Sequence, residues 1–176
     1  MAALLSLGVN GITGISNEHG GTDRRIDVGT LIEARQISKM ICSFTSNPHP
    51  SRVTPFVQLY NDGLIEAELV PMGTLAERIR AAAFGIGGFY TPTAAGTEAA
   101  EGKEQREFHG RLHVFEFPLP ADYAFIRAWK ADTMGNLHFR LALRNFNPIM
   151  AMAATITIVE VENDIAAPGD LDPDQI

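Results

Sequence analysis

The stretch Pro71-Met72-Gly73-Thr74 combines residue types that can build a site for an anion. It follows the largely apolar run 65–70, which predicts a strand of a covered sheet ended by Pro71. Thr74 opens a helical pattern, and Glu77 stands at the spacing of a capping box. Ligands of open α/β sheets bind beyond the carboxyl ends of strands, and free N–H groups at a helix N-terminus favour negative charge. This turn is therefore predicted to bind a carboxylate or an oxyanion.

Two other loops are candidates for the same edge of a sheet. Residues 12–16 predict a strand, and the polar loop Asn17-Glu18-His19-Gly20-Gly21 follows it. The second loop contains Gly85, Gly87 and Gly88, which end the helix that begins at Thr74. A strand at 89–93 follows, so residues 65–93 predict a β-α-β unit.

Metal and nucleotide chemistry find little support in the sequence. The five histidines are scattered, and only His109 and His113 approach the spacing of metal ligands. They flank a predicted hairpin tip, where side chains four residues apart do not converge as they do on a helix. The run Gly85-Ile86-Gly87-Gly88 follows a helix and matches no phosphate-binding fingerprint. We expect neither a metal site nor a mononucleotide loop.

The elements that position these residues alternate between strands and helices. Strands are predicted at 12–16, 39–45, 65–70, 89–93, 112–117, 123–128, 137–141 and 155–161, and helices at 1–8, 27–36, 51–60, 74–86 and 147–154. Asp27 is the expected N-cap of the second helix, and Asn147 with Pro148 are expected at N-cap and N1 of the last. The pattern predicts one domain, residues 1–176, of the α/β class, with an open, mostly parallel sheet flanked by helices and a β-hairpin insertion at 107–111.

Composition narrows the class of protein. The 176 residues are 45% hydrophobic and 20% charged, which is typical of a globular α/β domain. The net charge of −7 argues against nucleic acid and anionic membranes as partners. No run is long and apolar enough to span a bilayer. The single cysteine, Cys42, lies in an apolar run and predicts a buried strand residue in a reducing, cytoplasmic protein.

Several blocks together resemble one family. They are Leu-Val-Pro-Met-Gly-Thr-Leu-Ala-Glu-Arg-Ile-Arg (69–80), Gly-Gly-Phe-Tyr-Thr-Pro-Thr (87–93), Ala128-Trp129-Lys130-Ala131-Asp132, Arg144-Asn145-Phe146-Asn147-Pro148 and Thr157-Ile158-Val159-Glu160-Val161-Glu162. In this order they resemble the A (α) subunit of a family I 3-oxoacid CoA-transferase. The resemblance implies the CoA-transferase fold, which is NagB/RpiA-like. Relatives of this type begin with an extra strand and a Gly-Gly-Phe-Gly loop, and they continue past a Leu-Asp-Pro-Asp segment, so both ends are expected to be trimmed.

The resemblance also implies a division of labour. Family members transfer CoA through a glutamate nucleophile, which in two-gene members lies in a Ser-Glu-Asn-Gly motif of the B subunit. That motif is absent here. The acidic residues near strand ends are Glu18, Glu66, Glu68, Glu77, Glu160 and Glu162; Glu77 is better explained as a cap partner, and Glu66 and Glu68 as exposed strand positions. We expect no catalytic residue in this chain, coenzyme A as a substrate without a permanent cofactor, and a B-type partner in an α2β2 or similar assembly.

In such an enzyme the A chain is expected to form one wall of the substrate cleft. By motif match its substrate- or CoA-binding residues are Asn17, Glu18, Met72, Gly73, Thr74, Gly87, Gly88, Phe89 and Asn145. A purely structural explanation exists for some of them. Gly87 and Gly88 would end a helix, Thr74 would cap one, and Asn145 would stabilise a turn.

Two departures from the family pattern leave the reaction open. Relatives commonly have glutamine where Met72 stands, and methionine cannot donate a hydrogen bond. Phe84 adds bulk where relatives are glycine-rich. The alternatives to transfer between an acyl-CoA and a 3-oxoacid or short carboxylic acid are a chain repurposed for acyl-CoA hydrolysis or ring opening, and a non-catalytic remnant.

Overall fold

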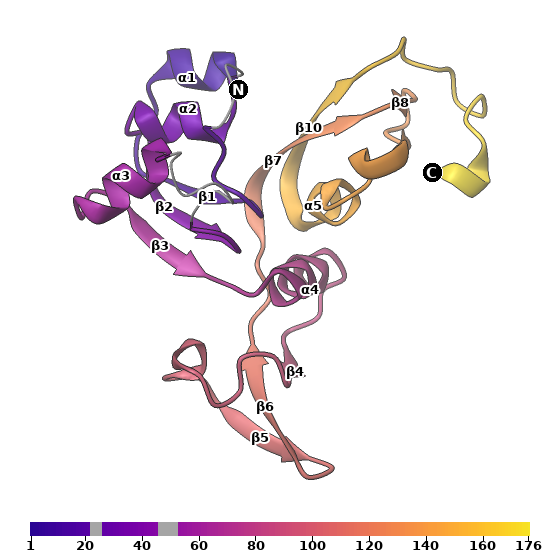
Figure 1. Cartoon of the computed structure of the whole chain (residues 1–176). Helices are drawn as coiled ribbons and strands as arrows, with labels where there is room; N and C mark the ends of the chain where they lie inside the picture. The colour runs from indigo at the N-terminus through magenta and orange to yellow at the C-terminus, as the bar shows by residue number, and fades with distance from the viewer. Residues whose placement is uncertain (22–25, 46–52) are drawn as a thin grey trace. The chain divides into compact units, whose positions relative to one another are not determined.

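The computed structural model describes residues 1–21, 26–45 and 53–176 (Figure 1). Contacts divide the chain into two compact units, one of Met1–Leu75 with Pro92–Val114 and one of Ala76–Thr91 with Phe115–Ile176. The boundary passes through helix α4 and strand β6. The single-domain organisation remains a prediction.

A three-stranded parallel sheet forms the centre of the first unit. Its order is β1 (Ile12–Ile15), β2 (Ile37–Cys42) and β3 (Glu66–Leu69). Helix α2 (Val28–Glu33) connects β1 to β2, and helix α3 (Pro55–Asn61) connects β2 to β3, which makes two consecutive β-α-β units (Figure 1). The buried core of these elements contains Leu31, Ile32, Ile37, Met40, Cys42, Phe56 and Ile65. The predicted burial of Cys42 in a strand is confirmed.

Local sequence signals explain where these helices begin and end. Asp27 caps α2 as predicted, accepting hydrogen bonds from the N–H groups of Gly29 and Thr30. Helix α1 (Ala2–Leu7) ends at Gly8, whose φ of 65° is left-handed. The predicted helix at 51–60 begins later, because Thr54 is its N-cap and Pro55 its first residue; Ser51 lies outside the described residues.

Helix α4 (Met72–Ala83) begins two residues before its predicted start. The N–H of Leu75 donates to the carbonyl of Pro71 at 2.8 Å, so Thr74 lies inside the first turn and is not the cap. The predicted capping box with Glu77 is therefore wrong, and Glu77 instead pairs with Arg80 at 2.8 Å. The helix ends at Ala83, three residues before the predicted end at 86, and Gly85, one of the glycines predicted to end it, has a φ of 68°.

The strand after α4 does not complete the predicted β-α-β unit. Strand β4 (Phe89–Thr91) belongs to a sheet of order β4-β6-β5, with β5 (Gln105–Phe108) antiparallel to β6 (Arg111–Glu116). The turn between β5 and β6 is His109-Gly110, and both residues have positive φ, as a two-residue hairpin requires. The predicted hairpin insertion is confirmed, and the pairing of β4 is corrected. A short 3₁₀ turn, η1 (Glu98–Ala100), precedes β5.

The second unit contains another parallel pair, β7 (Ala121–Ala128) with β10 (Ala154–Val161), and helix α5 (Asn147–Ala153) packs on it. Phe146 is the N-cap of α5, so Asn147 and Pro148 lie one position further into the helix than predicted. Short strands β8 (Lys130–Ala131) and β9 (Leu137–His138) pair antiparallel across a turn organised by Asp132. The remaining 3₁₀ turns are η2 (Leu141–Leu143) and η3 (Pro173–Gln175).

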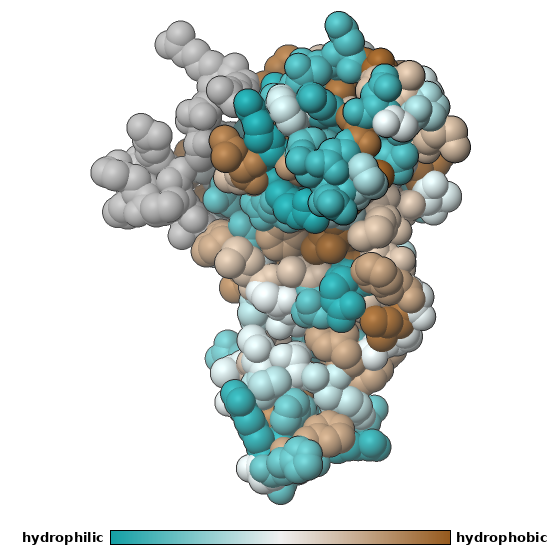
Figure 2. Space-filling view, turned by 90° about the vertical axis from the view of Figure 1, so that its right-hand side faces the viewer, coloured by the Kyte–Doolittle hydropathy of each residue, from teal (hydrophilic) through white to brown (hydrophobic). Residues whose placement is uncertain are grey.

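Hydrophobic side chains also remain on the surface. Figure 2 shows hydrophobic residues among hydrophilic ones on one side of the molecule. One face of the β7–β10 pair carries Tyr123, Phe125, Ile156 and Ile158, all close to half exposed and aligned in register. None of the helices in the described part of the chain is long and apolar enough to cross a membrane.

The fold is thus α/β, with parallel strands, flanking helices and an antiparallel hairpin, as the sequence predicts. The parallel strands belong to two sheets rather than one.

Candidate functional site

The carboxyl ends of β1, β2 and β3 lie side by side because backbone hydrogen bonds continue past each strand. The N–H of Ser43 donates to the carbonyl of Asn17 at 3.1 Å, and the N–H of Val70 donates to the carbonyl of Cys42 at 2.9 Å. The loop after β1, the residue after β2 and the turn after β3 therefore meet at one edge of the sheet. We call Asn17, Glu18, Ser43, Met72, Gly73 and Thr74 the carboxyl-end site.

Helix α4 begins at this edge. Its first N–H groups, those of Met72, Gly73 and Thr74, have no carbonyl one turn earlier within the helix. With twelve residues, α4 also adds its partial positive charge at this end. Met72 is 50% exposed and Gly73 is exposed, so these residues contact solvent rather than the core.

Three buried oxygens of the site have no hydrogen-bond partner among the described residues. They are Asn17 Oδ1 in the loop after β1, Ser43 Oγ directly after β2, and Thr74 Oγ1 in the first turn of α4. Buried polar groups are almost always paired in native proteins. The one other buried side-chain oxygen of this kind in the described part of the chain belongs to Gln36, away from this edge. Unpaired oxygens are thus concentrated where the chain's topology predicts a ligand.

The loop that carries Asn17 and Glu18 is held in place from two sides. The His19 ring is buried, stacks on Phe56 with ring centres 4.7 Å apart, and its Nδ1 lies 3.4 Å from the hydroxyl of Thr54. Burial lowers the pKa of His19, although Glu18 and Asp27 oppose that shift. On the other side, the N–H of Gly21 donates to Asp27 Oδ2 at 2.9 Å.

Ser43 is the site residue that sequence reasoning missed. The predicted strand 39–45 would have placed it in the middle of an element, whereas β2 ends at Cys42. Had the strand been ended at the last residue of the apolar run 40–42, Ser43 would have fallen at the carboxyl end beside Asn17.

The carboxylates near strand ends are either paired with a cation or exposed. Glu68 pairs with Lys39 at 3.2 Å, Glu77 with Arg80 at 2.8 Å, and Glu162 with Arg127 at 3.0 Å. The remaining three, Glu18, Glu66 and Glu160, are exposed. Among the described residues, no group of three or more His, Cys, Asp and Glu side chains could hold a metal ion.

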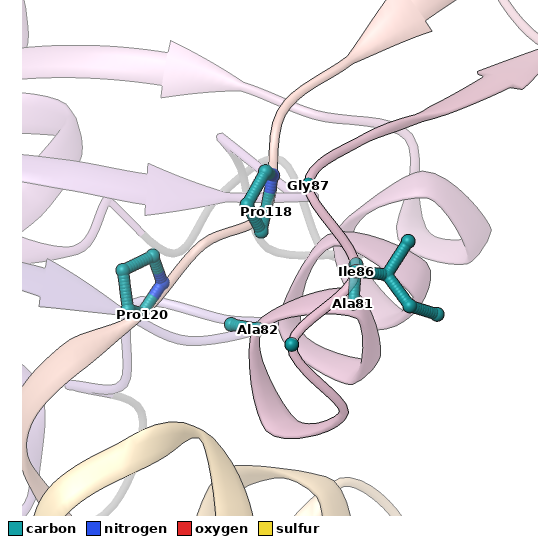
Figure 3. Close-up of a pocket in the computed structure, with 7 residues that line it drawn as sticks. Ala81, Ala82, Ile86, Gly87, Pro118 and Pro120 are labelled. Atoms are coloured by element: carbon teal, nitrogen blue, oxygen red, sulfur yellow. The ribbon is translucent and has the colours of Figure 1, made fainter.

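The other predicted site residues belong to the second unit. Gly87 lines a shallow groove of about 260 Å³ with Ala81, Ala82, Gly85, Ile86, Pro118 and Pro120, a mostly apolar set (Figure 3). Gly88 has a packing role, since a Cβ there would lie 2.2 Å from the ring of Phe115. Phe89 is half-buried in β4, and Phe84 is exposed at the end of α4.

Asn145 has a conformational role. It is exposed and has a φ of 23° in the turn before α5, a conformation that asparagine tolerates better than most residues. The structure therefore brings Asn17, Glu18, Met72, Gly73 and Thr74 to one edge, and it groups Gly87, Gly88 and Phe89 in the other unit.

Comparison with known proteins fixes the family. All of residues 1–176 match the family described as Coenzyme A transferase. The chain belongs to the coenzyme A transferase family. It is 50% identical over 169 residues to the A subunit of the probable succinyl-CoA:3-ketoacid coenzyme A transferase of Bacillus subtilis (strain 168), covering 96% of this chain and 68% of that protein. It is 48% identical over 173 residues to the A subunit of the 3-oxoadipate CoA-transferase of Pseudomonas putida, covering 98% of this chain and 72% of that one.

Solved structures agree on the fold of this transferase-family chain. Glutaconate coenzyme A-transferase from Acidaminococcus fermentans matches with a TM-score of 0.78 at 22% identity. The match covers 98% of this chain and 60% of the glutaconate enzyme's chain. At that identity the likeness establishes the fold alone.

Proposed function

We propose that this chain is the A subunit of a heteromeric CoA-transferase, which moves CoA between an acyl-CoA and a 3-oxoacid or short carboxylic acid. The observation that carries the proposal is 50% and 48% identity, over nearly the whole chain, to two proteins named as A subunits of such enzymes. The carboxyl-end site is the part of this chain that would face the substrate.

The reaction assigns the covalent steps to a partner. A glutamate of the B-type partner attacks the acyl carbonyl of the acyl-CoA, the C–S bond breaks, and CoA thiolate leaves an acyl-glutamyl anhydride. The thiolate then attacks the glutamyl carbonyl and releases the first acid. The acceptor carboxylate attacks the carbonyl of the resulting glutamyl-CoA thioester and expels CoA thiolate, which forms a second acyl-glutamyl anhydride. The thiolate then attacks the acyl carbonyl of this anhydride, which gives the new acyl-CoA and frees the glutamate.

This chain would contribute binding and electrostatic stabilisation. The N–H groups at the start of α4 can stabilise an oxyanion or a carboxylate, and the half-exposed Met72 can pack against the apolar part of a substrate. Gly87 and the apolar groove beside it are the second region proposed to contact substrate or CoA, together with Gly88, Phe89 and Asn145.

The test is reconstitution with a B-type subunit that carries a Ser-Glu-Asn-Gly motif. We expect the complex to form acetoacetyl-CoA from succinyl-CoA and acetoacetate, and the isolated chain to form none. Glu18→Gln in this chain should leave measurable turnover, because Glu18 is exposed and is not the nucleophile. Turnover by the rigorously purified chain alone, abolished by replacing one of its own glutamates, would overturn the proposal.

Acyl-CoA hydrolysis or ring opening is a second candidate, and Met72 is the observation that favours it. At the first position of α4, methionine provides no side-chain donor for a polar 3-oxoacid. Release of free CoA by the complex at equal rates with and without acceptor acid would support hydrolysis. No product from any acyl-CoA in the presence of the partner would support a non-catalytic remnant.

A further inference from the structure

Ser43 lies between the two other polar strand ends. Its N–H is bonded to the carbonyl of Asn17, and the preceding residue, Cys42, accepts a hydrogen bond from Val70. Its backbone position is therefore fixed on both sides. Its hydroxyl oxygen is nevertheless buried without a hydrogen-bond partner in the described part of the chain.

Thr74 repeats this arrangement on the neighbouring element. The residue is only 4% exposed, and its hydroxyl is also without a partner among the described residues. It is the third residue of α4, so its own N–H is one of the groups that the helix leaves free. A buried, unpaired hydroxyl thus accompanies a free helix N-terminus.

Such an arrangement destabilises the protein unless a ligand completes it. A buried hydroxyl that lacks a partner loses its hydrogen bonds to water and gains none in return. Unpaired polar groups of this kind occur at functional sites, where a bound group supplies the missing partner. Ser43 directly follows β2, and Thr74 lies in the first turn of the helix that follows β3, so one ligand at this edge of the sheet can supply both partners.

The donors available at this edge select the ligand's chemistry. Serine and threonine hydroxyls and the helix N–H groups can all donate hydrogen bonds. Lys39, a cation of the β2 strand that precedes Ser43, is already paired with Glu68 of β3 at 3.2 Å. A singly charged, planar group with two acceptor oxygens matches such a set of neutral donors.

We infer that the hydroxyls of Ser43 and Thr74 together bind the carboxylate of the short acid that exchanges CoA, an inference that rests on the proposed function. Ser43 then becomes a specificity residue. The Oδ1 of Asn17, also unpaired among the described residues, is an acceptor and is not assigned to the carboxylate.

Stability and binding should respond to Ser43→Ala and Thr74→Val in opposite directions. Each change removes a hydroxyl that has no partner among the described residues of the free protein, so the Tm of the isolated chain should stay constant or rise by about 2–4 °C. In the reconstituted complex, the KM for acetoacetate should rise about three- to tenfold for each variant, which corresponds to one lost hydrogen bond.

Thr54→Val is the matched control. Thr54 is also a buried threonine at a helix start, but its hydroxyl accepts from the N–H of Val57 and lies 3.4 Å from His19 Nδ1. This variant should lower the Tm. If Ser43→Ala or Thr74→Val lowers the Tm as much as Thr54→Val, the hydroxyls have structural partners and the inference is overturned.

A direct binding measurement separates this inference from the proposed function. Millimolar acetoacetate should raise the Tm of the isolated wild-type chain, and the shift should be lost in Ser43→Ala, whether or not the complex has transferase activity. Inorganic phosphate is the second probe and should give a smaller shift. An equal shift with phosphate would contradict the carboxylate assignment, and an unchanged acetoacetate shift in both variants would exclude Ser43 and Thr74 from the site.

Discussion

Arg78 and Glu116 form a buried ion pair in the second unit, with Arg78 Nε 3.9 Å from Glu116 Oε2. The same Nε donates to the carbonyl of Phe117 at 3.0 Å, and the carbonyl of Arg78 accepts from the N–H of Leu119 at 2.9 Å. Arg78 of α4 thereby attaches the segment from Glu116 to Leu119 to the helix. The groove lined by Pro118 and Gly87 depends on this attachment.

We predict that Arg78→Met strongly destabilises the chain. Glu116 is 4% exposed, and the substitution removes the cation that pairs with its carboxylate. Removal of one member of a buried ion pair lowers the free energy of unfolding by about 3–5 kcal/mol. Arg80→Met is the control on the same helix, because Arg80 pairs with Glu77 at the exposed surface and should change the Tm little. Equal Tm values for the two variants would show that the Arg78 pair contributes nothing to stability.

A second prediction concerns pH and His19. Burial lowers the pKa of His19, so the unfolded chain takes up a proton more readily than the folded chain. The stability associated with neutral His19 is fully present above pH of about 6.5 and is lost as the pH falls through the lowered pKa. His19→Phe keeps an aromatic ring against Phe56 and should flatten the dependence of the free energy of unfolding on pH.

The charged groups near His19 are Glu18 on its own loop and Asp27 at the start of α2, and both oppose the lowering. His109→Asn, at the exposed hairpin turn, is the control for loss of a histidine outside the Asn17 loop. The measurement is urea unfolding between about pH 5 and 8, on either side of the ordinary histidine pKa. A His19→Phe profile parallel to that of the wild type would refute a contribution from His19.

The third prediction tests the departure at Met72. Met72→Gln restores a side-chain donor at the first residue of α4 and should lower the KM for acetoacetate in the complex. The expected gain in binding free energy is that of one net hydrogen bond, about 0.5–1.5 kcal/mol. The Tm should change little because Met72 is 50% exposed. A lowered Tm with unchanged kinetics would mean that Met72 supports packing rather than substrate binding.

The sheet edge was the part of the site most accessible to sequence reasoning. Apolar runs ended by Asn17 and by Pro71 placed β1 and β3 correctly, and Asp27 marked the start of α2 through its side-chain oxygens. These signals are local, because strand periodicity and helix caps depend on residues a few positions apart. The convergence of Asn17 with Met72 then followed from parallel topology.

Non-local features were not accessible in the same way. The spacing of Thr74 and Glu77 fits a capping box. The carbonyl of Pro71, however, already accepts a helical hydrogen bond from the N–H of Leu75, so α4 begins two residues before Thr74. Strand β4 pairs with β6, which is about twenty residues away in the sequence, so no local pattern indicates this pairing. The sequence pattern likewise predicts Gly88 as a helix stop, whereas the ring of Phe115 is what leaves no room for a side chain there.

The last prediction concerns the support of the Asn17 loop by Gly29. A Cβ at Gly29 would lie 2.3 Å from the nitrogen and 2.5 Å from the Cα of Gly21, and backbone atoms cannot move aside without shifting the whole loop. Gly29→Ala should therefore lower the free energy of unfolding by about 1–3 kcal/mol, as overpacking does, and weaken the acetoacetate-dependent rise in Tm. Gly73→Ala is the stability control, since Gly73 is also the second residue of a helix and a Cβ there meets no atom within 4 Å. Alanine should stabilise that helix by about 0.5–1 kcal/mol. If the Tm of Gly29→Ala equals or exceeds that of Gly73→Ala, the loop is free to move away from α2 and does not fix the position of Asn17.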